Sequence, residues 1–234
     1  MEVIVMLTHN DVTIPDCLAA LDRVLPSGVR HIGFKDIGAN LTTLGLLNER
    51  IKKAGRTSYM EVVSETPETC LASARTAVDI GVDRLLGGTD VGWTLEILQG
   101  SGIVYYPFPG FPIGHPTRLG GTAKDIADHC RRFVAAGAAG VDLLAYRAEE
   151  ADPLALVRAA RSALGTHELI VAGSVNSPAR IRALETAGAD AFTIGTALFD
   201  GSFAPGANGL EAQLRHVLSA LAAAAAVAQA ARGK

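Results

Sequence analysis

Cysteine is scarce in this sequence, and the positions of the cysteines argue against a disulfide-stabilised fold and against a cysteine metal site. Only three cysteines, Cys17, Cys70 and Cys130, occur in 234 residues. An odd number of widely spaced cysteines fits neither a disulfide framework nor the close spacing of metal ligands. We therefore expect three reduced thiols that are mostly buried.

The sequence also lacks an excess of positive charge and a long apolar run. Lys and Arg number 21 against 24 Asp and Glu, and the formal net charge is -3. Binding to a nucleic-acid backbone needs a basic stripe, so we expect no nucleic-acid partner. The chain enters the run "EVIVML" directly after Met1, with no basic leader and no membrane-length stretch free of glycine and charge. This pattern predicts a cytoplasmic protein with no membrane partner.

Several motifs of known active sites are missing as well. The sequence contains no H-E-x-x-H, C-x-x-C or G-x-S-x-G and no paired histidines at ligand spacing. A dedicated metal site and a serine nucleophile are therefore not predicted, although Mg²⁺ carried in by a phosphate ligand stays open. No G-x-G-x-x-G follows the first apolar run, which disfavours a dinucleotide fold.

Short Val/Ile/Leu-rich runs alternate with amphipathic helical patterns about eight times, which is typical of βα units with a parallel sheet. The expected strands lie near 2–9, 31–37, 57–64, 84–89, 103–108, 141–147, 168–174 and 191–197. The expected helices lie near 16–25, 41–54, 67–80, 91–99, 122–137, 152–164, 177–187 and 210–231. We predict one (β/α)8 TIM-barrel domain over residues 1–234, with an open doubly wound sheet as the alternative.

Two further patterns fit a barrel. Gly-Ala or Gly-Val steps such as "AGAAGVD", "DIGVDR" and "TAGADA" recur just before strands, as helix C-caps at the end of the barrel remote from catalysis should. The chain ends on "ALAAAAAVAQAARGK", which is strongly helix-forming. We expect an eighth helix there, and an Ala-rich face leaves a subunit contact, and so a homo-oligomer, open.

The stretch "VAGSVNSPARIRALETAGADAFTIGTALF", residues 171–199, carries the strongest functional signal. It predicts two strands that end in Gly173-Ser174 and Gly195-Thr196. The loops after strands seven and eight of a barrel often bind phosphate through backbone N–H groups, and only small residues let the backbone approach an anion closely. We predict a phosphate site at these four residues and a small phosphorylated metabolite as ligand. The alternative is that small residues only let helices pack on strands.

This stretch resembles the C-terminal quarter of the ribulose-phosphate-binding TIM barrels. That group includes histidine and tryptophan biosynthesis barrels, sugar-phosphate epimerases, and the orotidine and keto-gulonate phosphate decarboxylases. The resemblance implies a TIM barrel with a phosphate site, and because FMN enzymes use a related phosphate grip, FMN stays a cofactor alternative. Around "HIGFKD" the chain is similar to N-acetylmannosamine-6-phosphate epimerases, which also carry an inward lysine there. It departs from them at Ala172, where those enzymes have an acidic residue.

Lys35 and Glu61 are the main candidates for chemistry. In "HIGFKDIG" the apolar Ile32 and Phe34 suit the helix side, which turns Lys35 inward. In "TSYMEVVS" the same alternation turns Glu61 inward on the neighbouring strand. Such a pair could transfer a proton next to a carbonyl, or Lys35 could form a Schiff base. A purely structural ion pair is the alternative.

Other polar residues stand at strand ends. His9 could act in acid/base catalysis with Asp11, or both could be loop residues at a helix start. Arg147 could bind a substrate carboxylate or a second phosphate, or pair with a nearby glutamate. Glu65 is a further strand-end candidate, whereas Asp90 is best explained as a helix cap.

The loop "PFPGFPIGHPTRLGGT", residues 107–122, is longer than most βα loops. Long loops at this face are commonly lids or binding loops, and His115 and Arg118 are its side chains suited to a polar substrate. Its prolines also fit a rigid surface excursion.

These features together favour an isomerase or epimerase that moves a proton at carbon in a small phosphorylated sugar or sugar acid, through an enediolate. A lyase, either a Schiff-base aldolase or a decarboxylase, is the first alternative. A decarboxylase pattern Asp-x-Lys-x-x-Asp would need an aspartate where Gly33 stands. The second alternative is a non-catalytic binder of a phosphorylated metabolite or of FMN.

Overall fold

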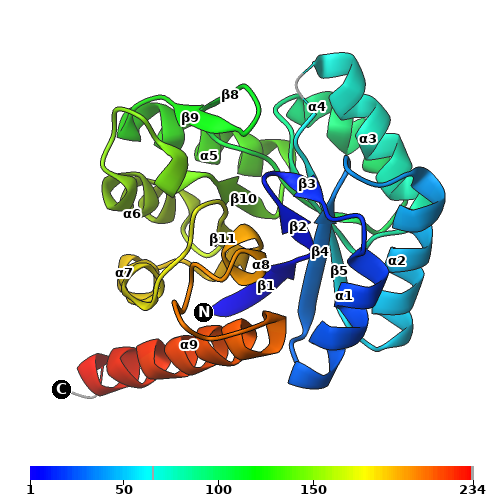
Figure 1. Ribbon diagram of the computed structural model, residues 1–234. Helices are drawn as coiled ribbons and strands as arrows, with labels where there is room; N and C mark the ends of the chain where they lie inside the picture. Colours follow the sequence, from blue (N-terminus) through cyan, green and yellow to red (C-terminus); the bar gives the residue numbers. More distant parts are fainter. Residues whose placement is uncertain (65, 233–234) are drawn as a thin grey trace.

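Eight parallel strands form a barrel in the computed structural model, which describes residues 1–64 and 66–232 (Figure 1). The strands follow one another around the sheet in the order β10-β11-β12-β1-β4-β5-β6-β7. Their bounds are Glu2–Met6 (β1), His31–Lys35 (β4), Thr57–Val62 (β5), Arg84–Gly87 (β6), Val104–Tyr106 (β7), Gly140–Leu143 (β10), Glu168–Val171 (β11) and Ala191–Ile194 (β12). The predicted TIM-barrel fold is confirmed.

The first and last strands of this order, β10 and β7, face each other and close the barrel. The Ala139 N–H donates to the Tyr105 carbonyl at 3.1 Å, and the Asp142 N–H donates to the Pro107 carbonyl at 3.0 Å. An open doubly wound sheet would leave both of these edges unpaired. The alternative of an open sheet is therefore wrong.

Helices follow the strands and cover the outside of the barrel. Their bounds are Cys17–Val24 (α1), Leu41–Lys53 (α2), Pro67–Ile80 (α3), Val91–Leu98 (α4), Ala123–Ala136 (α5), Pro153–Leu164 (α6), Pro178–Ala187 (α7), Thr196–Phe199 (α8) and Leu210–Arg232 (α9), with 3-10 turns at Leu25–Ser27 (η1) and Ala145–Arg147 (η2). Eight helices lie where the sequence predicts them, whereas α8 was not predicted and begins within the segment 191–197 that was expected to be a strand. The strands are shorter at their C-terminal ends than predicted. The segment 141–147, for example, leaves the strand after Leu143 and ends in η2.

The glycines before strands end helices, as their sequence context predicts. Gly81, Gly137 and Gly188 cap α3, α5 and α7 in the left-handed conformation, with φ of 70°, 111° and 92°. A residue with a Cβ adopts this conformation only with strain, whereas glycine adopts it freely. These tight turns lie at the N-terminal ends of the strands, so the C-terminal ends are left for longer loops.

Side chains fill the barrel interior in layers. The middle is apolar and consists of Ile4, Met6, Tyr59, Leu86, Tyr106, Ile170 and Ala191. Towards the N-terminal ends of the strands, Arg84 pairs with Glu168 at 2.8 Å, and the Tyr106 hydroxyl donates to the same carboxylate at 2.5 Å. Towards the C-terminal ends the interior becomes polar again, and the cavity described below opens there.

Two short hairpins add to the C-terminal end of the barrel. The first joins β2 (Thr8–His9) to β3 (Val12–Thr13), and the second joins β8 (Phe111–Ile113) to β9 (Arg118–Gly120). The second hairpin comes from the Pro- and Gly-rich loop, so that segment is an ordered excursion rather than a structureless loop.

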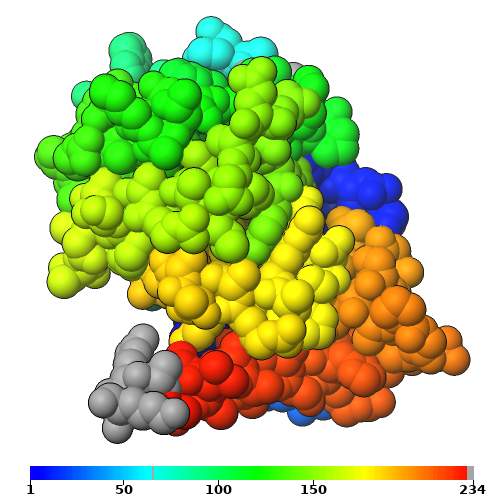
Figure 2. All heavy atoms as spheres, turned by 90° about the vertical axis from the view of Figure 1, so that its left-hand side faces the viewer, coloured from blue at the N-terminus to red at the C-terminus, as the bar shows by residue number. Residues whose placement is uncertain are grey.

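The last helix, α9, lies along one end of the molecule. Figure 2 shows α5, α6 and α7 side by side on one face, with α9 along its lower edge. Arg23 on α1 holds Glu211 near the start of α9 through two hydrogen bonds of 2.7 Å each. Among the described helices, none combines the length and the apolar character needed to cross a membrane.

Candidate active site

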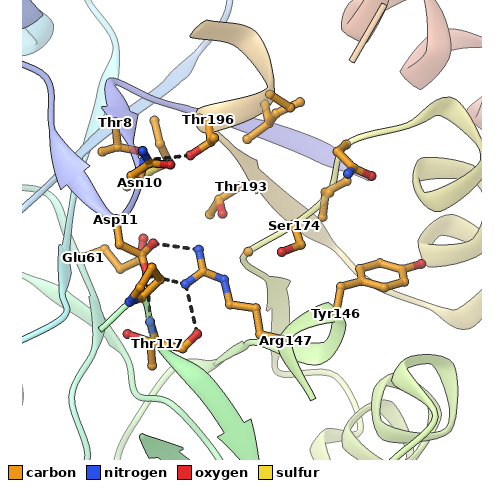
Figure 3. Close-up of a pocket in the computed structure, with 18 of the residues that line it drawn as sticks. Thr8, Asn10, Asp11, Glu61, Thr117, Tyr146, Arg147, Ser174, Thr193 and Thr196 are labelled. Atoms are coloured by element: carbon orange, nitrogen blue, oxygen red, sulfur yellow. Dashed lines mark hydrogen bonds and ion pairs between the residues drawn. The ribbon is translucent and has the colours of Figure 1, made fainter. Parts of the chain in front are cut away.

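A cavity of about 400 Å³ opens at the C-terminal ends of the strands (Figure 3). Segments far apart in the sequence build its wall. It is lined by Met6, Thr8, Asn10, Asp11, Lys35, Glu61, Pro116, Thr117, Arg118, Tyr146, Arg147, Gly173, Ser174, Val175, Asn176, Thr193, Ile194, Gly195, Thr196, Ala197, Asp200 and Ser202. The cavity therefore joins the predicted phosphate loops to the predicted catalytic pair.

Lys35, Glu61 and Asp11 form a buried ion-pair cluster in this cavity. Lys35 and Glu61 are register partners on β4 and β5, and both face inward. Lys35 Nζ lies 2.7 Å from Asp11 Oδ1 and 3.4 Å from Glu61 Oε2. The exposed fractions of Lys35, Glu61 and Asp11 are 4%, 2% and 3%. The close approach of Lys35 and Glu61 follows the alternation read from the sequence, while their chemical roles stay a prediction.

Asp11 is the centre of the cluster, and a tight turn brings it there. Asn10 and Asp11 adopt positive φ of 48° and 64° between β2 and β3, a conformation that asparagine and aspartate tolerate better than most residues. The Asp11 carboxylate accepts hydrogen bonds from Lys35 Nζ, from the Thr117 N–H at 2.9 Å, and from both terminal nitrogens of Arg147. Asp11 thus fixes the positions of Lys35 and Arg147 and ties the Pro-rich loop to the barrel.

The charge of Asp11 is stabilised by these partners. Burial by itself raises the pKa of the carboxyl, but the hydrogen bond from Arg147 and the positive charges of Lys35 and Arg147 outweigh it. The pKa of Asp11 is held well below its ordinary value. Asp11 is therefore an ionised anchor for two cations rather than a group that exchanges protons near neutral pH.

Arg147 crosses the cavity from η2. Its Nη2 donates to Asp11 Oδ1 at 2.7 Å, and its Nη1 donates to the Thr117 carbonyl at 3.1 Å as well as to Asp11 Oδ2. Figure 3 shows the guanidinium pointing towards Asp11. A pairing of Arg147 with a nearby glutamate, one of the alternatives read from the sequence, is not what forms.

The four residues predicted to bind phosphate lie together on the cavity wall, at the ends of β11 and β12. Gly195 precedes α8, and the Thr196 hydroxyl accepts a hydrogen bond from the Asn10 N–H at 3.1 Å. Packing also requires both glycines: a Cβ at Gly173 would lie 2.3 Å from Arg147 Nε, and one at Gly195 would lie 2.9 Å from the Thr8 carbonyl. Phosphate binding itself stays a prediction.

Asp142 on β10 is a buried acid that the sequence analysis did not single out. Its side chain is fully buried, and among the described residues neither carboxyl oxygen has a hydrogen-bond partner. Burial raises the pKa of Asp142 well above its ordinary value, and the negative charge of Glu61 raises it further. Val141 and Leu143 pack on the helix side, so the period of two in "VDLL" was the signal that points this aspartate inward.

Three predicted residues stand apart from this cluster. His9 and His115 do not line the cavity. Because the side chain of Thr8 faces the cavity, strand alternation turns His9 away, and His115 is exposed at the tip of the second hairpin. Arg118 does line the cavity, but its guanidinium pairs with Glu149 at 2.7 Å. The geometry gives no support to the roles predicted for the two histidines.

Glu65 and Asp90 are the other strand-end candidates. Glu65 lies outside the described residues. Asp90 occupies the N-cap position of α4, where its backbone carbonyl accepts the Thr94 N–H, but its side chain makes no capping hydrogen bond to the described part of the chain. Within residues 1–64 and 66–232, no cluster of three or more His, Cys, Asp or Glu side chains is arranged to hold a metal ion.

Comparison with known proteins supports the fold of this chain but assigns it no activity. No protein-family model and no curated protein sequence matches the chain. A solved structure described as "Native KDPGal structure" is 12% identical, with a TM-score of 0.67, over 97% of this chain and 96% of that one. The orotidine 5'-phosphate decarboxylase from Pyrococcus horikoshii OT3 is 15% identical, with a TM-score of 0.63, over 94% and 98%.

A third similar structure is a cube-shaped, highly porous protein cage designed by fusing symmetric oligomeric domains. It is 13% identical, with a TM-score of 0.68, over all of this chain and 75% of that one. At such identities the likeness concerns the barrel alone. The orotidine 5'-phosphate decarboxylase belongs to one of the groups that the sequence resemblance named.

Proposed function

We propose that this protein is an enzyme that binds a small phosphorylated sugar or sugar acid and transfers a proton at a carbon next to its carbonyl group. The observation that carries the proposal is one cavity lined both by the loops after β11 and β12 and by Lys35 and Glu61. Its volume of about 400 Å³ lies within the range of small-molecule sites.

The phosphate would bind at the end formed by Gly173, Ser174, Gly195 and Thr196. The first N–H groups of a helix have no partner within the helix, so the start of α8 offers backbone donors to an anion. The loop of Gly173 and Ser174 follows the neighbouring strand β11 and lines the same cavity, and Arg147 lies against Gly173. An anion at this place would therefore contact backbone donors from two loops and a neighbouring cation.

The chemical step assigned to the other end is proton transfer. The Glu61 carboxylate would remove the proton from the carbon next to the carbonyl, and the electron pair would move to the carbonyl oxygen. The Lys35 ammonium would stabilise the resulting enediolate oxyanion. Delivery of a proton to the former carbonyl carbon, together with transfer of the hydroxyl proton to the other enediolate oxygen, gives isomerisation. Delivery of a proton from a second acid, such as water, to the opposite face of the original carbon gives epimerisation.

A lyase that uses Lys35 as a Schiff-base nucleophile is the second candidate. In its favour, Lys35 is a lysine on the wall of the cavity. Against it, Lys35 Nζ already contacts the carboxylates of both Asp11 and Glu61, whereas attack on a carbonyl needs a free amine lone pair. Proton transfer needs no such rearrangement, and it is therefore the leading proposal.

The test is solvent exchange at carbon. Sugar phosphates that raise the melting temperature are incubated with the protein in D₂O, and NMR follows deuterium entering next to the carbonyl. Glu61→Gln should slow this exchange by about 10²–10⁴-fold and leave the affinity for inorganic phosphate nearly unchanged. Glu49→Gln, at an exposed position on α2, is the matched control. Full exchange activity in Glu61→Gln would refute the proposed base.

Borohydride separates the two candidates. Reduction in the presence of a keto substrate should leave the mass of Lys35 unchanged if the protein is an isomerase or epimerase. Addition of the substrate mass to Lys35, read by mass spectrometry, would establish the lyase instead.

A further inference from the structure

A second cavity, of about 280 Å³, adjoins the first at the C-terminal end of the barrel. Its wall combines the apolar side chains of Val62, Val63, Cys70, Phe108, Pro112 and Ile113 with Ser64, Gly88, Thr89, Gly114 and Thr117. The Ser64 hydroxyl donates to Asp36 Oδ2 at 2.6 Å and so is already engaged elsewhere. Unlike the first cavity, the second is lined by no charged side chain of the described residues.

Several parts of the chain build this space, among them Cys70 of α3 and Phe108 after β7. The end of β5 contributes Val62, and the residue after it is Val63; both directly follow Glu61 of the first cavity. The end of β6 contributes Gly88, whose φ of 71° suits glycine, and which adds no side chain to the space. The second hairpin contributes Pro112 and Ile113, and Ile113 remains 52% exposed. An apolar side chain this exposed at the mouth of a cavity loses water contact when an apolar ligand binds.

Thr117 is the wall that the two cavities share. Its backbone is held from both sides, because its N–H donates to Asp11 and its carbonyl accepts from Arg147. The apolar cavity therefore has a fixed position relative to Lys35, whose ammonium contacts the same aspartate. The second cavity and the cavity of Lys35 and Glu61 therefore meet at Thr117.

We propose that the second cavity binds an apolar group, an aromatic ring or a short alkyl chain, of the same phosphorylated substrate. This inference rests on the proposed function and narrows its substrate class to phosphate esters that carry an apolar substituent. The size is sufficient, because an apolar cavity of roughly 150 Å³ already admits benzene. A sugar hydroxyl group placed against Val62, Val63 or Phe108 would meet no hydrogen-bonding side chain, and Thr89 and Thr117 line other parts of the space.

The experiment measures binding of inorganic phosphate and of benzyl, 2-phenylethyl and 3-phenylpropyl phosphate by calorimetry. The series varies the reach between the phosphate loops and the second cavity. Burying a phenyl ring should make the best-fitting member bind about 10- to 100-fold more tightly than inorganic phosphate. Equal affinity across the whole series would overturn the proposal while leaving the phosphate site intact.

A matched pair of variants assigns the gain to this cavity. Ile113→Asn should reduce the gain by about three- to tenfold, because a polar amide replaces an apolar wall. Phe111→Asn is the control: Phe111 lies on the same strand and is 50% exposed, but its ring packs against His129. The control should keep the full gain. A loss in both variants, or in neither, contradicts the assignment.

The phosphate-free compound 3-phenylpropanol separates this inference from the proposed function. Failure of inorganic phosphate and all three esters to bind would refute the phosphate site, and with it the proposed function. If 3-phenylpropanol binds as tightly as its phosphate ester, the cavity serves a separate apolar ligand, and the inference of one spanning substrate is wrong. Weak binding of the alcohol and tight binding of the ester is the expected result.

Discussion

At the scale of single residues, the burial of the Asp142 carboxyl leads to a prediction about stability that can be tested without a substrate. The folded protein keeps a proton on Asp142 over a pH range where the unfolded chain, with an ordinary aspartate pKa of about 3.9, has lost it. The native state then binds more protons than the unfolded state, so this group lowers stability as pH rises from about 4. Asp142→Asn removes the titration. Relative to the native protein, the variant should gain stability with rising pH, at up to about 1.4 kcal/mol per pH unit.

Urea unfolding of both proteins at a series of pH values from about 4 to 8 measures this difference. The slope is the diagnostic quantity, because an asparagine can shift the whole curve through its own contacts without changing its dependence on pH. Asp16→Asn, at an exposed position, is the control for loss of a carboxyl at the surface. Parallel curves for the native protein and Asp142→Asn would show that Asp142 is ionised when folded.

At the scale of elements, the pairing of β10 with β11 depends on the missing side chain of Gly140. A Cβ at this position would lie 1.9 Å from the Glu168 carbonyl oxygen, and backbone atoms cannot move aside as a flexible side chain can. Gly140→Ala should therefore force the two strands apart. We expect it to lower the free energy of unfolding by about 3 kcal/mol, the upper part of the range for overpacking.

Gly92→Ala is also a glycine-to-alanine substitution, but we expect it to change the free energy of unfolding in the opposite direction. Gly92 lies in α4, is exposed, and has no atom within 4 Å of the place its Cβ would occupy. Alanine there should raise the free energy of unfolding by about 0.5–1 kcal/mol, because glycine is a poor helix former. Chemical denaturation of the two variants checks both signs, and a Gly140→Ala protein as stable as the native one would contradict the close approach of β10 to Glu168.

At the scale of the whole molecule, we expect a change at one end of the barrel to alter stability without altering ligand binding at the other end. The N-terminal end holds Arg84, Tyr106 and Glu168, and the C-terminal end holds the cavity. Glu168→Gln removes the charge that Arg84 and the Tyr106 hydroxyl contact, so we expect a loss of about 1–3 kcal/mol in stability. The affinity for inorganic phosphate should stay the same, since changes at distant, independent sites do not couple.

Two measurements on Glu168→Gln check this separation: urea unfolding for stability, and calorimetric titration with inorganic phosphate below the unfolding transition. A weaker phosphate affinity in a fully folded variant would show that the ends are coupled through the apolar middle of the barrel. Native stability would show instead that the Arg84 pair contributes nothing net, as many partly exposed ion pairs do.

The sequence by itself determined the order of strands and helices and the direction of the inward side chains. Both depend on neighbours a few residues away: alternation in "HIGFKD" turns Lys35 inward, and the same period in the next strand turns Glu61 towards it. The paired small residues at the ends of two strands likewise indicated where the cavity would lie. Such signals are local, so they can be read from a short segment without knowledge of the rest of the chain.

Only the tertiary structure decided which groups surround that pair. Asp11 meets Arg147 across 136 positions of sequence, and it meets Thr117 across 106, because closing the barrel brings loops from different strands to one end. The same closure buries Asp142 beside Glu61 and sets the apolar cavity next to the charged one. His115, which has suitable chemistry, lies exposed at the tip of the second hairpin and does not line the cavity. No short pattern encodes these contacts, because they depend on the packing of all the elements at once.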